Sequence, residues 1–253
     1  MGWARPLELS LIVPHRPNPY RGYRFPREVI AHAVRLYLRF ALSYRDVEEP
    51  LAERGVQVSY ETVRRSVAKF GGHYADELRR RALRAGRTWH LDEMATRVGD
   101  RVHWLWRAVD EHGQTLDVFL QAQRDTGAAA RFFRRLLDVA GGTTPTQSTT
   151  DRLGSYAAAL REIPELAGIE HLQVRVAQRC NNHVEQAHQA TRLRERVMRQ
   201  FKSSGSAQRF LDAFARVGNL FRPRRHRLSA GADRAAMRER VGTWRAVAAF
   251  GAA

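Results

Sequence analysis

The sequence predicts an α/β protein in which a mixed five-stranded sheet, flanked by helices, follows a small all-α region. Three patterns support this prediction. Apolar residues recur at three- and four-residue steps between positions 26 and 72, as in amphipathic helices. The period becomes two between positions 88 and 121, as in strands. Beyond position 126 helical and strand-like segments alternate, which is typical of a sheet covered on both sides.

The composition adds a strong positive charge to this fold. The chain has 43 Lys and Arg residues against 26 Asp and Glu residues, a net charge of +17 and a pI near 11.3. Such an excess predicts a polyanionic partner, and nucleic acid is favoured because no basic amphipathic helix suited to a membrane surface is evident at either end. Residues 192–227 hold eleven Lys and Arg residues but two acids, so we expect this block to follow a phosphate backbone.

Other classes of protein are disfavoured by what the sequence lacks. Cys180 is the single cysteine, which excludes an internal disulfide framework and argues against a structural zinc site. No run of about 18 apolar residues is present, and the proline-rich first 20 residues do not resemble a signal peptide. We therefore expect a soluble cytoplasmic protein, associated with the nucleoid and not with a membrane.

The N-terminal third is predicted to be helical after a loosely held arm. Residues 1–20 form the arm because they contain four prolines, which disfavour helix. Ser43 and Ser59 suit the N-cap positions of a second and a third helix, and the glycine pair 71–72 is expected to end the third. The three helices are predicted at 26–40, 44–53 and 60–70.

Residues 21–72 are predicted to form a helix-turn-helix domain, whose third helix can lie in the major groove. Arg64, Arg65 and Lys69 point outward on that helix and are candidate DNA ligands. A three-helix bundle that does not touch DNA is the alternative. Pro50 removes an amide donor from the second helix, so we expect that helix to be kinked or shortened. A helical linker is expected at 73–87.

The mixed sheet is predicted within residues 88–228. Short turn-rich connections favour antiparallel pairing of the first three strands. A helical tail is expected at 229–253. The strands are predicted at 88–92, 102–110, 116–121, before position 151 and at 169–174, and the helices at 126–140, 153–162 and from 181 onward.

Three acids occupy positions where this sheet could bring them together. Asp92 ends the first strand, Asp151 follows the fourth, and Glu185 lies near the start of the late helix. Glu185 could instead be an ion-pair partner within a basic helix. If the three carboxylates converge, they could hold two hard cations such as Mg²⁺. Two such ions can activate the attacking oxygen and stabilise the leaving oxygen during displacement at phosphorus.

The same late helix offers ligands for DNA. Arg192 lies seven residues after Glu185, about 20° short of two full turns, and His188 shares that face. Backbone amides at the start of the helix also suit a phosphate. The candidate DNA ligands in this region are Asn181, Asn182, His188, Arg192, Arg194, Arg196 and Lys202.

Several nearby residues are given other roles. Solvated or turn roles are favoured over metal binding for Glu93, Asp110 and Asp117. Of the three, Asp110 is the strongest candidate to bind a metal instead. Trp104 and Trp106 are predicted to pack in the core rather than stack on bases. His183 and His188 are five residues apart, off the four-residue step of a helical zinc site, so both are expected to face DNA or solvent.

Three motifs resemble one family of bacterial DDE insertion-sequence transposases, the family numbered six. They are WHLDE, TTDRLGSY and NNHVEQAHQATRLRER, and the likeness extends over roughly residues 21 to 245. The resemblance implies a ribonuclease H-like catalytic domain after a helix-turn-helix domain that recognises the ends of the element. It also implies Mg²⁺-dependent cutting and joining of double-stranded DNA, with Mn²⁺ as a substitute, by a homo-oligomer on paired ends. Asp92, Asp151 and Glu185 would form the metal-binding triad, with Arg192 as its basic companion.

The sequence departs from the family pattern in three places. The strand before Asp151 is polar, Gly154 replaces a basic residue, and Pro50 replaces an apolar helix former. A catalytically inactive copy that acts as a DNA-binding protein or repressor is therefore the alternative function. A recombinase with a covalent serine or tyrosine intermediate is a third possibility, which trapping of a protein–DNA adduct would support.

Overall fold

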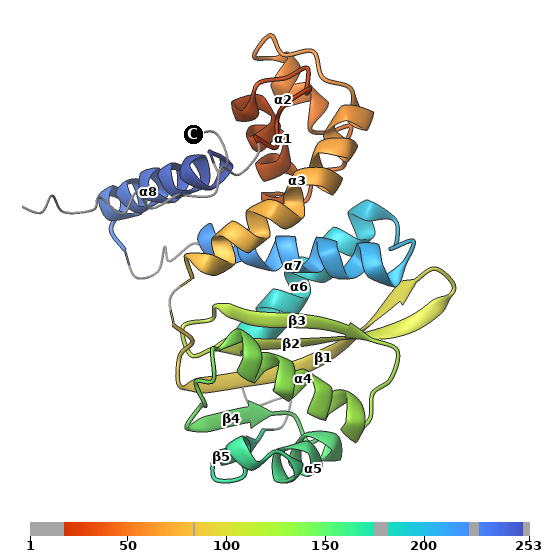
Figure 1. The fold of residues 1–253 in the computed structure, drawn as a ribbon, viewed down its shortest axis with the longest axis vertical. Coiled ribbons are helices and arrows are strands. Elements are labelled where there is room, and N and C mark those ends of the chain that lie inside the picture. The colour runs from red at the N-terminus through yellow and green to blue at the C-terminus, as the bar shows by residue number, and fades with distance from the viewer. Residues whose placement is uncertain (1–17, 83, 175–181, 223–227, 250–253) are drawn as a thin grey trace, which may run out of the picture.

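The fold consists of a mixed sheet with helices on both faces and a helical region beyond one of them (Figure 1). A computed structural model describes residues 18–82, 84–174, 182–222 and 228–249. None of the helices in these ranges is long and apolar enough to cross a membrane.

The N-terminal region contains three helices, α1 (Arg27–Arg39), α2 (Glu48–Ala52) and α3 (Tyr60–Arg80). The predicted N-cap of α3 is confirmed, because the Ser59 side chain accepts a hydrogen bond from the Thr62 amide. Ser43 and Asp46 exchange backbone-to-side-chain hydrogen bonds as in a capping box, but regular helix begins only at Glu48. With Pro50 inside it, α2 has five residues, which confirms the expected shortening.

The prediction that the third helix ends at Gly71 and Gly72 is wrong, since α3 continues to Arg80. Each glycine costs about 1 kcal/mol of helix propensity, but tertiary packing outweighs this cost. Phe70 and Tyr74 are fully buried on one continuous face of α3. A methyl group at Gly71 would lie 3.9 Å from the Ala213 side chain of a later helix, an ordinary van der Waals distance, so α3 packs against that helix at this position.

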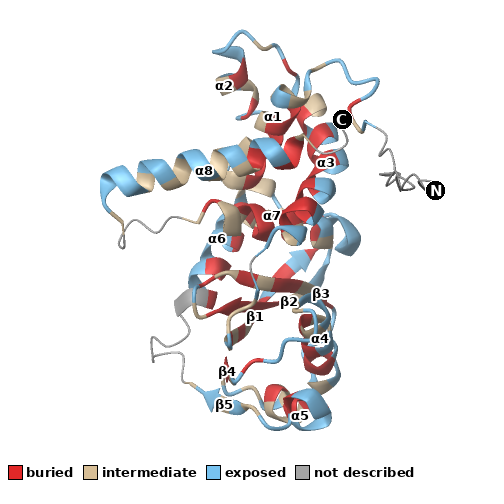
Figure 2. Ribbon diagram, turned by 60° about the vertical axis from the view of Figure 1, so that its left-hand side comes forward, coloured by how far each residue is buried: buried red, intermediate tan, exposed pale blue. Residues whose placement is uncertain are grey.

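Two C-terminal helices, α7 (Ser204–Leu220) and α8 (Ala230–Ala248), complete the core of the helical region. The ring of Trp244 packs edge-on against Tyr74, and its indole nitrogen donates to the Ala31 carbonyl. Tyr20 donates to the Ala248 carbonyl. Residues 229–249 are therefore attached to the N-terminal helices at the end of α8, although much of that helix is exposed (Figure 2).

The sheet has five strands in the order β3-β2-β1-β4-β5. Strands β1, β2 and β3 pair antiparallel, while β4 pairs parallel with both β1 and β5. This mixed five-stranded sheet confirms the predicted fold class. The strands are β1 (Thr88–Val98), β2 (Arg101–Asp110), β3 (Thr115–Gln121), β4 (Gln147–Thr150) and β5 (Glu170–Gln173).

Different helices cover the two faces of the sheet. Helices α4 (Thr126–Val139) and α5 (Gly154–Glu162) pack on one face around Trp106. Helix α6 (Asn182–Met198) and α7 lie on the other face. Because successive side chains of a strand point to opposite faces, neighbouring residues of β1 and β2 meet different helices.

Candidate active site

The three acids predicted to converge line one cavity of about 250 Å³ at the edge of β1. They come from the middle of β1, the end of β4 and the first turns of α6. The structure thus brings together residues that are far apart in the sequence. The prediction that Asp92 ends the first strand is wrong, because β1 continues to Val98 in its pairing with β2. The lining residues are Asp92, Glu93, Met94, Asp151, Val174, Glu185, His188, Gln189 and Arg192.

Strand pairing explains the positions of the two aspartates. The register joins β4 to β1 only from Thr88 to His90, so the edge of β1 is open from the next residues onward. Asp92 lies at this open edge, and Asp151 follows directly after β4, which runs parallel to β1. The Asp151 carboxylate accepts a hydrogen bond from the Leu153 amide at 2.9 Å, which fixes its orientation at the start of α5.

Glu185 reaches the cavity because α6 is held against β2 by polar contacts. Arg107, buried in β2, donates to the Ala187 carbonyl at 3.0 Å and to the Thr191 hydroxyl at 2.7 Å. Apolar contact on this part of α6 is small and involves Val109, Val184 and Ala187. Glu185 itself is exposed, as a residue that meets an external ligand must be.

His188 lies beside Asp92 and does not face solvent, so its prediction as a DNA-facing or solvated residue is wrong. Its side chain is buried, with Nδ1 3.5 Å from the Asp92 carboxylate. Burial lowers the pKa of His188, and the contact with Asp92 offsets this shift only in part. The imidazole is therefore largely neutral at pH 7, and it leaves the Asp92 charge available to a cation.

Arg194 is also misassigned as a DNA ligand. Its side chain is buried, and the guanidinium lies 3.9 Å from the ring centre of Tyr37. It donates to the carbonyls of Phe40 and Leu42 at the end of α1. Arg194 therefore joins α6 to the helical region and has no surface to offer DNA.

The remaining predicted DNA ligands whose side chains the structure describes are exposed. Arg64 and Arg65 are exposed on α3, and both form ion pairs with Glu61. Asn181 lies outside the described residues, and Asn182 is the first residue of α6. The other exposed residues are Lys69, Arg192, Arg196 and Lys202.

Glu93 also lines the cavity, which the sequence analysis did not predict. Its prediction as a solvated or turn residue is wrong, because its side chain is buried. Its carboxylate accepts hydrogen bonds of 2.6 Å from Arg124 Nε and from the Tyr156 hydroxyl. Burial raises the pKa of Glu93, and the nearby Asp151 raises it further. A guanidinium nitrogen of Arg124 also lies 3.7 Å from Asp151, so Arg124 joins the two carboxylates.

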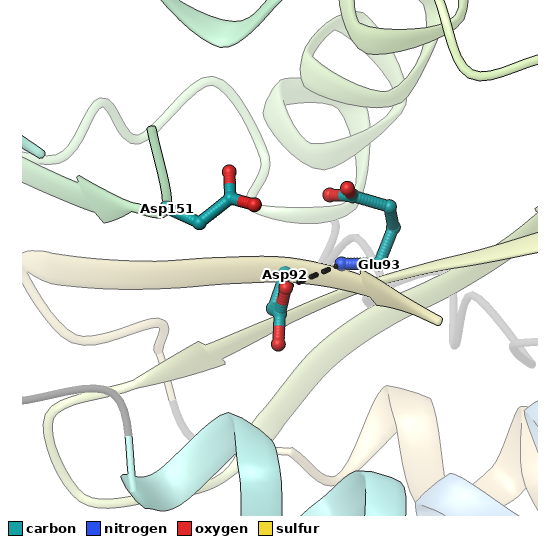
Figure 3. A group of neighbouring side chains, drawn as sticks. All are labelled: Asp92, Glu93 and Asp151. Carbon is teal, nitrogen blue, oxygen red and sulfur yellow. Dashed lines mark hydrogen bonds between the residues drawn. The ribbon is translucent and has the colours of Figure 1, made fainter. Parts of the chain in front are cut away.

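Asp92, Glu93 and Asp151 each place an oxygen within 4.8 Å of the others. Figure 3 shows Asp92 and Glu93 on opposite sides of β1, with Asp151 beside the strand. An all-oxygen set of this kind fits a hard cation such as Mg²⁺. Glu185 is not part of this close group but lines the same cavity from α6, and Glu93 already has two hydrogen-bond partners.

The other acids near the strands have structural roles. Asp110 accepts hydrogen bonds from the amides of His112 and Gln114, which confirms its predicted turn role. Asp117 is buried and forms ion pairs with Arg135 and Arg216, so its prediction as a solvated or turn residue is wrong.

The two tryptophans of β2 differ in burial. Trp106 is fully buried, as predicted. Trp104 is partly exposed. The Arg124 guanidinium packs over its indole ring, with the guanidinium carbon 4.8 Å from the ring centre. Trp104 therefore supports the arginine that joins Glu93 and Asp151.

Comparison with known families and proteins agrees with this geometry. A family model described as a DDE domain matches residues 86–224, which contain the sheet and the cavity, so the chain belongs to the DDE-domain family. The transposase of the insertion sequence-like element IS431mec from Staphylococcus aureus is 30% identical over 211 residues, which cover 83% of this chain and 92% of that protein. The transposase of element IS257 in transposon Tn4003, also from Staphylococcus aureus, matches to the same extent. Within the DDE-domain family, the chain is a bacterial insertion-sequence transposase.

Two solved structures show more distant likeness. The HTLV-2 integrase catalytic core domain in complex with magnesium, in its dimeric form, has a TM-score of 0.41 at 13% identity. The match covers 61% of this chain and 97% of that one. The catalytic domain of Mos1 mariner transposase has a TM-score of 0.40 at 14% identity, and covers 72% of this chain and 91% of that one.

Proposed function

We propose that this transposase binds the ends of its insertion element and catalyses metal-dependent cleavage and strand transfer of DNA. One observation carries the proposal most strongly. Asp92, Asp151 and Glu185 come from three separate elements and line the same cavity, which Arg192 also lines. A carboxylate cluster beside a guanidinium suits a phosphodiester, because metal ligands and a phosphate ligand then lie side by side.

The side chains around the cavity would have different roles in the reaction. When bound there, Mg²⁺ would supply activation of the attacking oxygen and stabilisation of the leaving oxygen. Asp92, Asp151 and Glu185 would hold the metal. Arg192 would orient the phosphate that undergoes displacement.

Three further side chains would hold the carboxylates in the orientation that the metal needs. Neutral His188 buttresses Asp92 without neutralising its charge. Arg124, held by Glu93, orients Asp151 from the other side. These residues do not need to touch the DNA in order to affect the geometry of the carboxylates.

Recognition of the element ends is assigned to the helical region. Arg64, Arg65 and Lys69 form an exposed basic stretch on α3, and the ion pairs of both arginines are with one partly exposed acid, Glu61. Exposed ion pairs contribute little stability, so a DNA phosphate could replace Glu61 at small cost. We further propose that the protein acts on paired ends as a homo-oligomer.

Strand transfer of labelled element ends with Mg²⁺ tests the enzymatic proposal. Asp92→Asn is expected to lower the rate at least a thousandfold, because it removes a metal-binding charge. Asp138→Asn, an exposed acid on α4, is the matched control and should retain wild-type activity. If the wild-type protein binds the ends but is inactive with both Mg²⁺ and Mn²⁺, the protein is a DNA-binding protein and not an enzyme.

A further inference from the structure

A second cavity, of about 610 Å³, lies at the C-terminal end of α6. Arg192 lines both this cavity and the one that holds the carboxylates, so the two are neighbours along one helix. The lining residues of the second cavity are Arg97, Arg192, Glu195, Arg196, Arg199 and Gln200. We refer to it as the arginine cavity.

Helix geometry aligns the two cavities. Arg192 and Arg196 lie seven and eleven residues after Glu185, so both fall within about 20° of its direction around the helix axis. The same face of α6 therefore carries first a carboxylate and then two guanidinium groups. Arg97 is supplied from β1, the strand that also carries Asp92.

The single acid of the arginine cavity already has partners. Glu195 accepts hydrogen bonds from the Thr96 hydroxyl at 2.6 Å and from the Arg97 amide at 3.1 Å. It thus ties α6 to β1. In the described part of the chain, none of the four arginines forms an ion pair with a carboxylate, so the cavity keeps an excess of positive charge.

The chain after α6 adopts an uncommon conformation that completes the cavity. Arg199 and Gln200 have φ values of 53° and 88°, a region that costs non-glycine residues about 1 kcal/mol or more. The Gln200 side chain donates to the Gly99 carbonyl, and the Gly99 amide donates to the Phe201 carbonyl. These contacts hold the turn in place and present Arg199 at the cavity.

We infer that the arginine cavity binds backbone phosphates of double-stranded DNA next to the phosphate held at the carboxylates. This inference rests on the proposed function and assigns Arg97 and Arg199 to DNA binding in addition to Arg192 and Arg196. Four guanidinium groups suit phosphate oxygens. The lining contains no aromatic or apolar side chain on which a base could stack, so the cavity positions the DNA without reading its sequence.

The test is the salt dependence of DNA binding by the full chain, measured by fluorescence anisotropy. The probe is a labelled duplex without the element ends, and EDTA is present so that metal plays no part. The double variant Arg97→Gln, Arg196→Gln removes two charges from the cavity. The matched control, Arg134→Gln, Arg161→Gln, removes two exposed arginines from α4 and α5. Thermal melting checks that both variants are folded.

Each lost phosphate contact reduces the slope of log K against log salt by about 0.9. We therefore expect the cavity variant to reduce the slope by about 1.8, and the control to leave it unchanged. A wild-type slope in the cavity variant, or an equal reduction in the control, would overturn the inference. Because EDTA prevents metal-dependent chemistry, this result is independent of whether Asp92→Asn abolishes strand transfer.

Discussion

Trp106 and Arg107 are neighbours in β2, yet they lie on opposite faces of the sheet and serve different purposes. Trp106 is buried among Phe132 and Tyr156 in the apolar layer beneath α4 and α5. Arg107 is equally buried, but it forms hydrogen bonds to α6. One face therefore stabilises the domain by burial of apolar area, whereas the other fixes the position of a helix by directed polar contacts.

On the polar face, burial of the Arg107 charge costs free energy, but the contacts of this side chain fix the position of α6. Burial lowers the pKa of Arg107 to about 10, a sign that its charge is poorly solvated. Desolvation of a buried charge can cost more than its polar contacts return, so we do not expect Arg107 to be explained by stability. Its value is that α6 cannot slide or rotate without losing the hydrogen bonds at Ala187 and Thr191, and Glu185 stays at the cavity.

The largest loss of stability is expected on the apolar face. Trp106→Ala removes a fully buried indole and should lower the free energy of unfolding by about 3–5 kcal/mol. Urea unfolding followed by circular dichroism measures this change. A loss below about 1 kcal/mol would mean that the apolar face is not the main source of stability.

A smaller, pH-dependent effect is expected at Glu93. Its pKa is raised above the ordinary value of 4.5, so the folded state binds the proton more tightly than the unfolded state. The resulting stabilisation is fully present below pH 4.5 and is lost as the pH rises through the raised pKa. Relative to Glu93→Gln, the wild-type free energy of unfolding should therefore fall as the pH rises above 4.5. Urea unfolding at several pH values measures this difference, and a constant or rising difference contradicts the assignment.

The smallest effect on stability is expected at Arg107. In Arg107→Met the Thr191 hydroxyl keeps its hydrogen bond to Ala187, and the buried charge is removed. The free energy of unfolding should therefore change by about 1 kcal/mol or less. Strand transfer should nevertheless fall about tenfold, because α6 loses the two hydrogen bonds that fix it beside Glu185. Loss of stability as large as in Trp106→Ala would show that the two faces do not differ in purpose.

The sequence located most of the elements, although not all of their ends, and it placed three acids that line one cavity. Strand periodicity located β1, β2 and β3, and the polar segment before Asp151 is a strand as expected. Asp92 and Asp151 were predicted to be neighbours because the ends of the first and fourth strands can lie side by side, and Glu185 was predicted to reach them from a covering helix. Their roles as metal ligands remain a proposal.

Burial of charged side chains was harder to predict. Arg194 lies nine residues after Glu185, about half a turn away around α6, so the helical spacing did contain a signal that it faces the other way. The burial of Glu93 depends on Arg124 and Tyr156, which are remote in the sequence. The continuation of α3 past Gly71 depends on α7 in the same way. For Glu93 and α3, contacts between distant segments, which no local pattern encodes, were decisive.

The central claim is that Asp92, Asp151 and Glu185 share a divalent cation. A crystal of the wild-type protein soaked in Mn²⁺ and measured near the manganese absorption edge tests this claim most directly. The account predicts an anomalous difference peak bounded by these three carboxylates. A protein crystal with Mn²⁺ bound elsewhere, or with these carboxylates free of metal at saturating Mn²⁺, would contradict it.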